Sequence, residues 1–289
     1  MKSKYSGDLF ALTCAISTGL ANIPEKIALD NVSAEILNFY LFVFAGILSA
    51  VSLFNTEKRR EILSPEPKIL SLIFFLSISY AFALTFGMSG LKIIQPATAS
   101  FLSRFEIIFT IALAYMLLKE RLTPVETLGG VIAVAGLFIF KYRTNMIISE
   151  GASFMVLSAL FFAISEVIVK RNIGRLGTAS FLFYRNLFLV PILLAILLFR
   201  KQTLYLPDYK ILLLTASGAL LGPIIGRATY QMALKRIDIS RAALITQSTP
   251  LFTALFALVI IQSLPSPIEW LGGLLIVGGV IVVKLSQRS

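Results

Sequence analysis

The chain has 289 residues, of which 57% are hydrophobic and only 14% are charged. Soluble domains are about 45–50% apolar and about 25% charged, so this composition excludes an ordinary soluble protein and indicates a membrane protein. The net charge of +11 comes from short basic clusters between apolar runs. Such clusters are typical of membrane anchors and argue against a nucleic-acid partner.

Ten apolar segments predict an all-α integral membrane protein, because a helix of about 20 apolar residues crosses a bilayer. Short connections rich in proline, glycine or asparagine separate the segments. The predicted spans are 7–28, 33–54, 68–90, 95–118, 125–142, 151–171, 178–199, 211–233, 239–262 and 268–285.

The basic residues predict the orientation. With both termini in the cytoplasm, the cytoplasmic segments hold 16 Lys and Arg residues and the opposite segments hold 7. Positive residues gather on the cytoplasmic side of membrane proteins. We therefore expect a multi-pass plasma (inner) membrane protein with both termini cytoplasmic.

The two halves of the chain repeat each other. Residues 91–141 align without a gap with residues 234–284, and a further match lays Tyr40 on Tyr184. The repeat predicts two similar five-helix units, residues 1–145 and residues 146–289. Because five crossings are an odd number, the second unit enters the membrane inverted. Inverted repeats around a central cavity are typical of transporters that work by alternating access.

Five charged residues fall inside the predicted spans. A charge at mid-bilayer costs at least about 2.5–3.5 kcal/mol, so such residues usually face a protein interior or a wet cavity. They indicate either a substrate or ion site, or structural ion pairs that hold helices together. The five are Arg104, Arg185, Arg227, Glu106 and Glu166.

Arg185 and Arg227 are the main candidates for substrate binding. The repeat places leucines at their counterparts, so the scaffold does not require them. Two guanidinium groups at one depth predict bidentate binding of a carboxylate or phosphate. Pairing with Glu166, or snorkelling towards lipid headgroups, is the structural alternative. Glu106 and Glu166 are the candidates for proton coupling, although adjacent arginines oppose protonation.

Five further residues complete the predicted binding site. Two tyrosines flank the arginines, and polar residues of the first and ninth spans, together with Arg104 of the fourth, are expected to line the cavity. Packing aromatics and hydroxyls bonded to their own helix are the simpler interpretation of these positions. The additional candidates are Tyr184, Tyr230, Asn22, Thr246 and Gln247.

No catalytic or metal-binding pattern is present. The chain has one cysteine, Cys14, and no histidine, which excludes an internal disulfide framework and makes a metal or redox site unexpected. Zinc-protease, glycine-rich phosphate-binding and P-loop motifs are absent. We therefore expect no enzyme activity, no cofactor and no ATPase within the chain.

Two segments carry a family resemblance. The stretch from Tyr230 to Thr253 reads YQMALKRIDISRAALITQSTPLFT, and Lys119 begins KERLTPVETLGG. Both resemble the EamA-type drug/metabolite transporter superfamily, and the similarity covers essentially the whole chain. The resemblance implies ten helices in two inverted repeats around a central cavity, and secondary transport, often export. The second copy has Gln262-Ser-Leu-Pro where the first has Lys119-Glu-Arg-Leu, so the charged turn is not repeated.

The predicted function is secondary active transport of a small organic metabolite, either amino-acid-like or anionic. Three arginines within the spans exceed two carboxylates, which favours an anionic group on the substrate. Two alternatives stay open: a multidrug or cation efflux transporter with structural arginines, and a non-transporting receptor or assembly subunit. The expected partners are the lipid bilayer, the substrate, and either a proton or a counter-substrate. The sequence leaves the substrate identity, direction and oligomeric state open.

Overall fold

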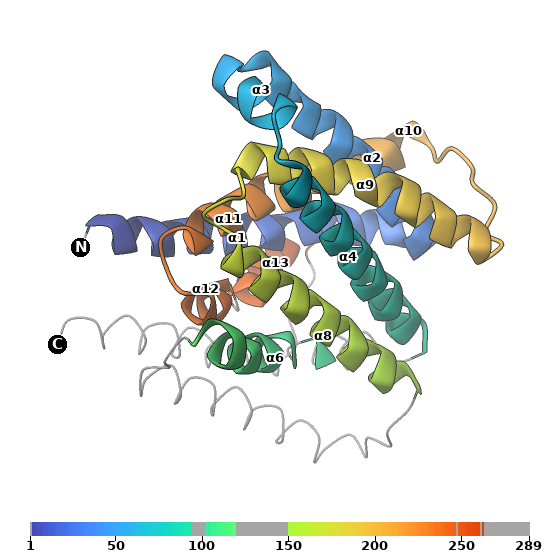
Figure 1. Cartoon of the computed structure of the whole chain (residues 1–289). Helices are drawn as coiled ribbons and strands as arrows, with labels where there is room; N and C mark the ends of the chain where they lie inside the picture. The colour runs from blue at the N-terminus through green and yellow to red at the C-terminus, as the bar shows by residue number, and fades with distance from the viewer. Residues whose placement is uncertain are drawn as a thin grey trace, which may run out of the picture.

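The computed structural model describes residues 2–93, 102–103, 105–119, 150–246, 248–260 and 262, and all regular structure in these residues is helical (Figure 1). The predicted spans at 125–142 and 268–285, and the candidates Arg104 and Gln247, lie outside the described residues. The first part of the chain forms α1 (Lys2–Leu29), α2 (Ala34–Ala50), the 3₁₀ turn η1 (Val51–Phe54), α3 (Thr56–Leu63), α4 (Pro67–Ile93), α6 (Phe105–Leu113) and the π-helical turn η2 (Ala114–Leu118). The second part forms α8 (Glu150–Arg171), α9 (Thr178–Phe199), α10 (Tyr209–Ala219), the π-helical η3 (Leu220–Gly226), α11 (Arg227–Leu234), α12 (Ile239–Thr246) and α13 (Thr249–Ile260).

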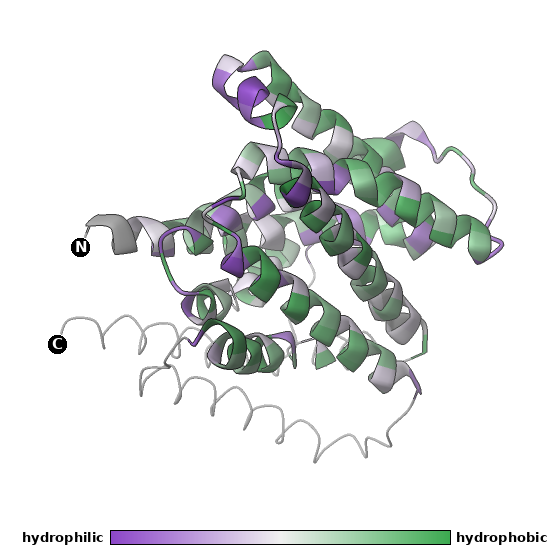
Figure 2. Cartoon of the chain, viewed as in Figure 1, coloured by the Kyte–Doolittle hydropathy of each residue, from purple (hydrophilic) through white to green (hydrophobic). Residues whose placement is uncertain are grey.

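Six helical segments of the described chain are long and apolar enough to cross a membrane. Hydrophobic residues dominate them along most of their length (Figure 2). They correspond to the second, third, sixth, seventh, eighth and ninth predicted spans. The total of ten crossings stays a prediction. The six segments are Ala34–Phe54, Pro67–Gly87, Glu150–Arg171, Thr178–Phe199, Tyr209–Leu234 and Ile239–Ile260.

A short polar helix, α3, follows the second span where the sequence predicted only a connection. Its N-cap is Asn55, whose side-chain oxygen accepts a hydrogen bond from the Lys58 backbone N–H at 3.1 Å. Glu57 in the first turn and Arg60 in the last turn suit the helix dipole. Within α3 only Ile62 is buried, so a single apolar side chain anchors this helix in the bundle.

The packing of the two halves follows one pattern twice. Helix α1 packs against α10–η3–α11, and its repeat counterpart α8 packs against α4. Likewise α1 contacts α13 and α8 contacts α6, while α2 contacts α10 and α9 contacts α4. Helices α2 and α9, which are counterparts of each other, lie side by side (Figure 1). Every one of these contacts joins the first half of the chain to the second.

Two equivalent hydrogen bonds continue this reciprocal pattern. The Tyr40 hydroxyl donates to the Tyr205 carbonyl at 2.9 Å, and the Tyr184 hydroxyl donates to the Ile62 carbonyl, also at 2.9 Å. Tyr40 and Tyr184 are counterparts in the sequence repeat. The acceptor Tyr205 comes after the end of α9, and the acceptor Ile62 comes after the end of α2. The two bonds therefore lie at opposite ends of this helix pair. Such an exchange of equivalent contacts is what a two-fold relation between the halves produces.

One end of the bundle is closely tied together, and we call it the amino-terminal face: the start of α1, α3, the start of α9 and the α11–α12 connection. The Arg241 guanidinium holds the Asp8 carboxylate through two hydrogen bonds of 2.7 and 2.5 Å. The Lys170 ammonium donates to the Leu234 and Ile237 carbonyls at 2.7 and 2.6 Å, which satisfies the end of α11. The Asp8–Arg241 pair joins the two halves of the chain.

Helix α3 also reaches across to the second half at this face. The Glu61 carboxylate accepts a hydrogen bond from the Ser180 backbone N–H at 3.1 Å, in the first turn of α9. The Ser180 hydroxyl donates to the Glu61 carbonyl at 2.5 Å. The N-cap of α9 is Gly177, which has no side chain to cap the helix, so Glu61 supplies the negative group that the helix N-terminus favours.

Replacing Gly177 with alanine is expected to weaken this link. A Cβ atom at position 177 would overlap the Glu61 carboxyl group. Loss of a capping contact costs about 0.5–2 kcal/mol, so the thermal unfolding midpoint in detergent should fall. Gly174→Ala is the matched control, because a Cβ there has no neighbour within 4 Å. Equal midpoints for the two variants would contradict the capping role of Glu61.

Candidate functional site

A cluster of polar and aromatic side chains lies in the middle of the bundle, where α4, α8, α9 and α11 meet. We call it the central cluster. Its members are connected by hydrogen bonds, an ion pair and ring contacts, and most are buried. The members are Tyr80, Glu166, Phe181, Arg185, Asn186, Arg227 and Tyr230.

Arg227 forms an ion pair inside the cluster. Its Nη1 atom lies 2.5 Å from Glu166 Oε1, and its Nη2 donates to the Tyr80 hydroxyl. Tyr80 in turn donates to Glu166 Oε1 at 2.9 Å, so the three side chains close a ring of hydrogen bonds. Glu166 is only 4% exposed. The cationic and neutral donors at Oε1 offset part of the cost of burying this carboxylate.

Arg185 has a different environment. Its guanidinium is 5% exposed and donates from Nε and Nη2 to Asn186 Oδ1, at 3.2 and 2.8 Å. Nη2 also lies 3.2 Å from the Pro223 carbonyl oxygen. Both acceptors are neutral, and within the described residues Arg185 makes no salt bridge. With one carboxylate and two guanidiniums, the central cluster therefore carries an excess positive charge.

Aromatic rings cover both guanidinium groups. The Arg227 Cζ atom lies 5.0 Å from the centre of the Tyr80 ring and 5.4 Å from that of Tyr230. The centre of the Phe181 ring lies 5.7 Å from the Arg185 Cζ atom and 5.6 Å from the Arg227 Cζ atom, so this ring contacts both arginines. Ring faces attract cations and exclude water, which strengthens every electrostatic interaction of the site.

The π-helical segment η3 shapes the cluster. Pro223 lacks the backbone N–H that an α-helix would use here, and the helix widens into a π-turn from Leu220 to Gly226. Side chains of other helices donate to carbonyls of this segment: the Ser17 hydroxyl donates to the Leu221 carbonyl at 2.7 Å, and Arg185 donates to the Pro223 carbonyl. The next residue after this segment is Arg227, so the distortion fixes where its side chain enters the bundle.

Several polar atoms around the cluster have no partner in the described part of the molecule. They are buried Glu166 Oε2, Arg227 Nε and both amide atoms of Gln231. Gln231 is fully buried and lies one helical turn after Arg227, on the same side of α11. Buried polar groups normally have partners, and an unpaired one costs about 1–3 kcal/mol. These donors and acceptors are therefore available to a ligand with both kinds of group.

The structure brings Arg185, Arg227, Tyr230 and Glu166 together in the central cluster, and their roles in substrate binding and proton coupling stay predictions. Tyr184 is placed elsewhere: its hydroxyl contacts the Ile62 carbonyl near α3, at the amino-terminal face. The contact predicted between the arginines and Glu166 forms for Arg227.

The remaining described candidates lie on α1, α6 and α12. The Asn22 amide donates to the Thr253 hydroxyl at 3.0 Å and links α1 to α13. The Thr246 hydroxyl donates to the Ala243 carbonyl of its own helix at 2.9 Å. This is the bonding within one helix that the sequence analysis gave as the alternative to cavity lining. Glu106 lies in the first turn of α6.

Sequence reasoning did not identify four residues of this region. Tyr80, Asn186 and Gln231 are polar residues inside predicted spans, and Asn186 and Gln231 directly follow the candidates Arg185 and Tyr230, which was the available signal. The fourth is Glu25 of α1. Its side chain lies against α10, where a Cβ on Gly218 would be 2.9 Å from Glu25 Cγ. In the described residues the Glu25 carboxyl has neither a salt bridge nor a hydrogen bond.

Comparison with protein-family models identifies one family. The model of the EamA-like transporter family matches residues 5–142 and again residues 149–285. An uncharacterized transporter of Synechocystis is 23% identical over 98% of this chain and 87% of its own length. An uncharacterized inner membrane transporter of Salmonella typhimurium is 24% identical over 100% of this chain and 98% of its own. A solved crystal structure shares the fold with a TM-score of 0.80, 19% identity and coverage of 99% and 98% of the two chains.

Proposed function

This chain belongs to the EamA-like transporter family, and from that premise we propose that it is a secondary transporter for a small organic metabolite with an anionic group. The observation that carries the proposal is the environment of Arg185. A guanidinium buried in a membrane protein with only neutral acceptors is costly, and a substrate carboxylate or phosphate would compensate its charge. The excess positive charge of the central cluster supports the same conclusion.

Within this class, an amino-acid-like substrate fits the unpartnered atoms. Arg227 Nε and the Gln231 amide nitrogen are donors that a carboxylate would accept from. Glu166 Oε2 and the Gln231 amide oxygen are acceptors that an ammonium group would satisfy. A zwitterion supplies both groups at a short separation. A simple anion would leave the two acceptors without partners.

Alternating access is the proposed mechanism, and the reciprocal packing of the two halves supports it. In inverted-repeat transporters the two halves exchange between two equivalent arrangements around a central site. Cross-half bonds at the two ends would then break in turn. Asp8–Arg241 and Glu61–Ser180 lie at the amino-terminal face, and Tyr40–Tyr205 lies at the opposite end.

Counterflow in proteoliposomes tests the substrate class. Vesicles with purified protein are preloaded with one unlabelled compound and exposed to a trace of the same compound in labelled form, for a panel of amino acids, organic acids and organic cations. We expect accumulation of zwitterionic or anionic members only. Accumulation of cations alone would instead support efflux of cationic drugs with structural arginines. The absence of flux for every solute would favour the non-transporting alternative.

Proton coupling, if the transporter uses it, is proposed to involve carboxyl groups of the bundle. In this proposal the substrate anion and Glu166 compete for Arg227. Binding of the anion would therefore free the Glu166 carboxylate to accept a proton. Glu106 lies in the first turn of α6, inside the fourth predicted span. Glu25 joins these candidates because it has no cationic partner among the described residues. Replacing each by glutamine and measuring proton-driven flux tests them, since unchanged coupling would eliminate the replaced residue.

Asp8→Asn is expected to increase the reactivity of Cys14. Cys14 is the only cysteine and is buried on α1 beside Gly226, the residue before Arg227, so it reports on access to the central cluster. Loss of a partly exposed ion pair is worth about 1 kcal/mol, which corresponds to about fivefold faster modification by a hydrophilic thiol reagent.

The matched control for this test is Lys235→Gln. It removes a charge at the same face, but the bond from Lys235 to Thr178 joins two segments of the same half. Its modification rate should equal that of the unaltered protein. A rate for Asp8→Asn that also equals this value would contradict the proposed role of the Asp8–Arg241 pair in closing the amino-terminal face.

A further inference from the structure

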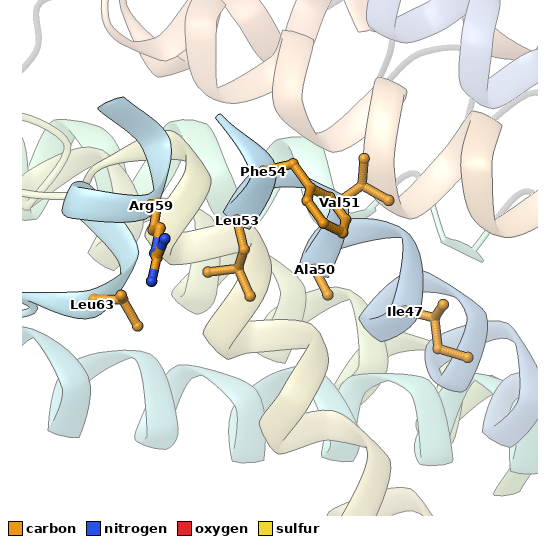
Figure 3. Close-up of a pocket in the computed structure, with 7 residues that line it drawn as sticks. All are labelled: Ile47, Ala50, Val51, Leu53, Phe54, Arg59 and Leu63. Carbon is orange, nitrogen blue, oxygen red and sulfur yellow. The ribbon is translucent and has the colours of Figure 1, made fainter. Parts of the chain in front are cut away.

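A groove on the outer surface lies between the end of the second span and α3 (Figure 3). One wall consists of Ile47, Ala50, Val51, Leu53 and Phe54, and α3 contributes Arg59 and Leu63. The volume of the groove is about 610 Å³. The groove shares no lining residue with the central cluster.

The lining of the groove is apolar although it faces outwards. Phe54 is 92% exposed, and Val51 and Leu63 are also exposed. Val51 and Phe54 occupy the last turn of a membrane-spanning segment, where the surroundings are acyl chains and lipid headgroups, and Leu63 ends the neighbouring helix α3. Apolar surface of this kind is stable against hydrocarbon and unfavourable against water. An apolar chain such as a lipid tail is therefore the expected occupant of the groove.

Arg59 adds a charge to this apolar lining. Its guanidinium makes no salt bridge in the described residues, and Lys58 and Arg60 place two further cations beside it on α3. Of the two acids of α3, Glu61 is already bound to Ser180, which leaves Glu57 alone. The helix therefore presents an excess of positive charge at the level where lipid phosphates lie. Arginine binds phosphate through paired N–H donors.

We propose that this groove binds one anionic phospholipid, with its phosphate at Arg59 and an acyl chain along Val51, Phe54 and Leu63. The lipid bridges α2 and α3. Because α3 holds α9 through Glu61, and the Tyr184 hydroxyl binds the Ile62 carbonyl, lipid binding stabilises the closed amino-terminal face. A helix with a single buried side chain is well suited to such support. The site gives the protein a means to respond to the charge of its membrane.

Native mass spectrometry of the full chain tests this proposal without any transport measurement. Protein is released from nanodiscs that contain equal amounts of phosphatidylglycerol and phosphatidylcholine, and the lipids that stay bound are counted. We expect one retained phosphatidylglycerol molecule. Arg59→Gln should reduce its retention about fivefold, which corresponds to about 1 kcal/mol for a basic residue near anionic lipid. Lys210→Gln, an exposed lysine at the other end of the bundle, is the control and should retain the lipid.

A second variant tests the groove independently of charge. Ala50→Phe fills the apolar wall and should exclude the acyl chain while Arg59 stays in place. Equal retention of phosphatidylglycerol in Arg59→Gln, Ala50→Phe and the unaltered protein would overturn the proposal. So would equal retention of phosphatidylcholine. Displacement of the lipid by millimolar inorganic phosphate would identify the site as one for free phosphate and would also reject the lipid.

Discussion

Arg185→Leu is expected to lose transport of the anionic substrate while the protein stays folded. A hydrogen bond to a charged group is worth about 1.5–3 kcal/mol, so the rate at low substrate concentration should fall about 10- to 100-fold. Stability should fall by about 1–3 kcal/mol, because the buried Asn186 oxygen and the Pro223 carbonyl, both neutral, lose their donor. No buried charge loses its counter-ion when this arginine is removed.

Two variants make this result interpretable. Arg185→Lys keeps the charge but loses the planar pair of donors, so its rate should lie between those of the leucine variant and the unaltered protein. Lys210→Leu removes an exposed lysine at the start of α10 and should transport normally. The measurements are counterflow of the anion that the panel selects, and the unfolding midpoint of each variant. Normal flux by Arg185→Leu would remove the anion site from the proposal.

The membrane-spanning helices followed from the sequence because their signal is local. Helix α9 spans Thr178–Phe199, the same residues as the predicted seventh span. An apolar run has to be helical in a bilayer, since its backbone groups find no other partners there. Helix α3 has no such signal, because its eight residues are mainly polar. Its stability depends on the Asn55 cap and on the contact with α9, and the second of these is a tertiary interaction.

The central cluster was only partly predictable, for reasons of geometry. Charged residues inside spans are conspicuous in a sequence, and the cost of burying them makes a mutual contact expected. Which neighbours accompany them depends on helix rotation. Tyr230 lies three residues after Arg227 and so shares its face, whereas Tyr184 directly precedes Arg185 and projects about 100° away. The sequence analysis treated both tyrosines alike, and the structure separates them.

The partners that the sequence analysis missed come from long-range packing. Tyr80 on α4 and Glu166 on α8 are 86 positions apart, and neither residue indicates the other in the sequence. The π-helical turn at η3 is another example, since a proline within a span predicts a kink without its direction. Ser17 and Arg185 donate to carbonyls of this segment, and such contacts with other helices cannot be read from the local sequence.

Breaking the Arg227–Glu166 pair is expected to have the largest effect on stability. Removing one partner of a buried ion pair leaves the other charge uncompensated, which costs about 3–5 kcal/mol. Arg227→Met would leave the Glu166 carboxylate with the Tyr80 hydroxyl as its remaining partner in the described residues. Glu166→Met would leave the Arg227 guanidinium in an apolar environment. Each variant should shift the midpoint of unfolding in an SDS titration strongly towards lower SDS.

The double variant Arg227→Met with Glu166→Met separates two roles of this pair, which are holding the helices together and binding the substrate. When both charges are replaced by apolar groups of similar size, the desolvation cost of the ions disappears, so the double variant should recover most of the stability lost in either single one. Its transport should not recover, because Arg227 is proposed to bind the substrate. A double variant that regains flux together with stability would show that this pair holds helices together and takes no part in recognition. The anion would then depend on Arg185 alone.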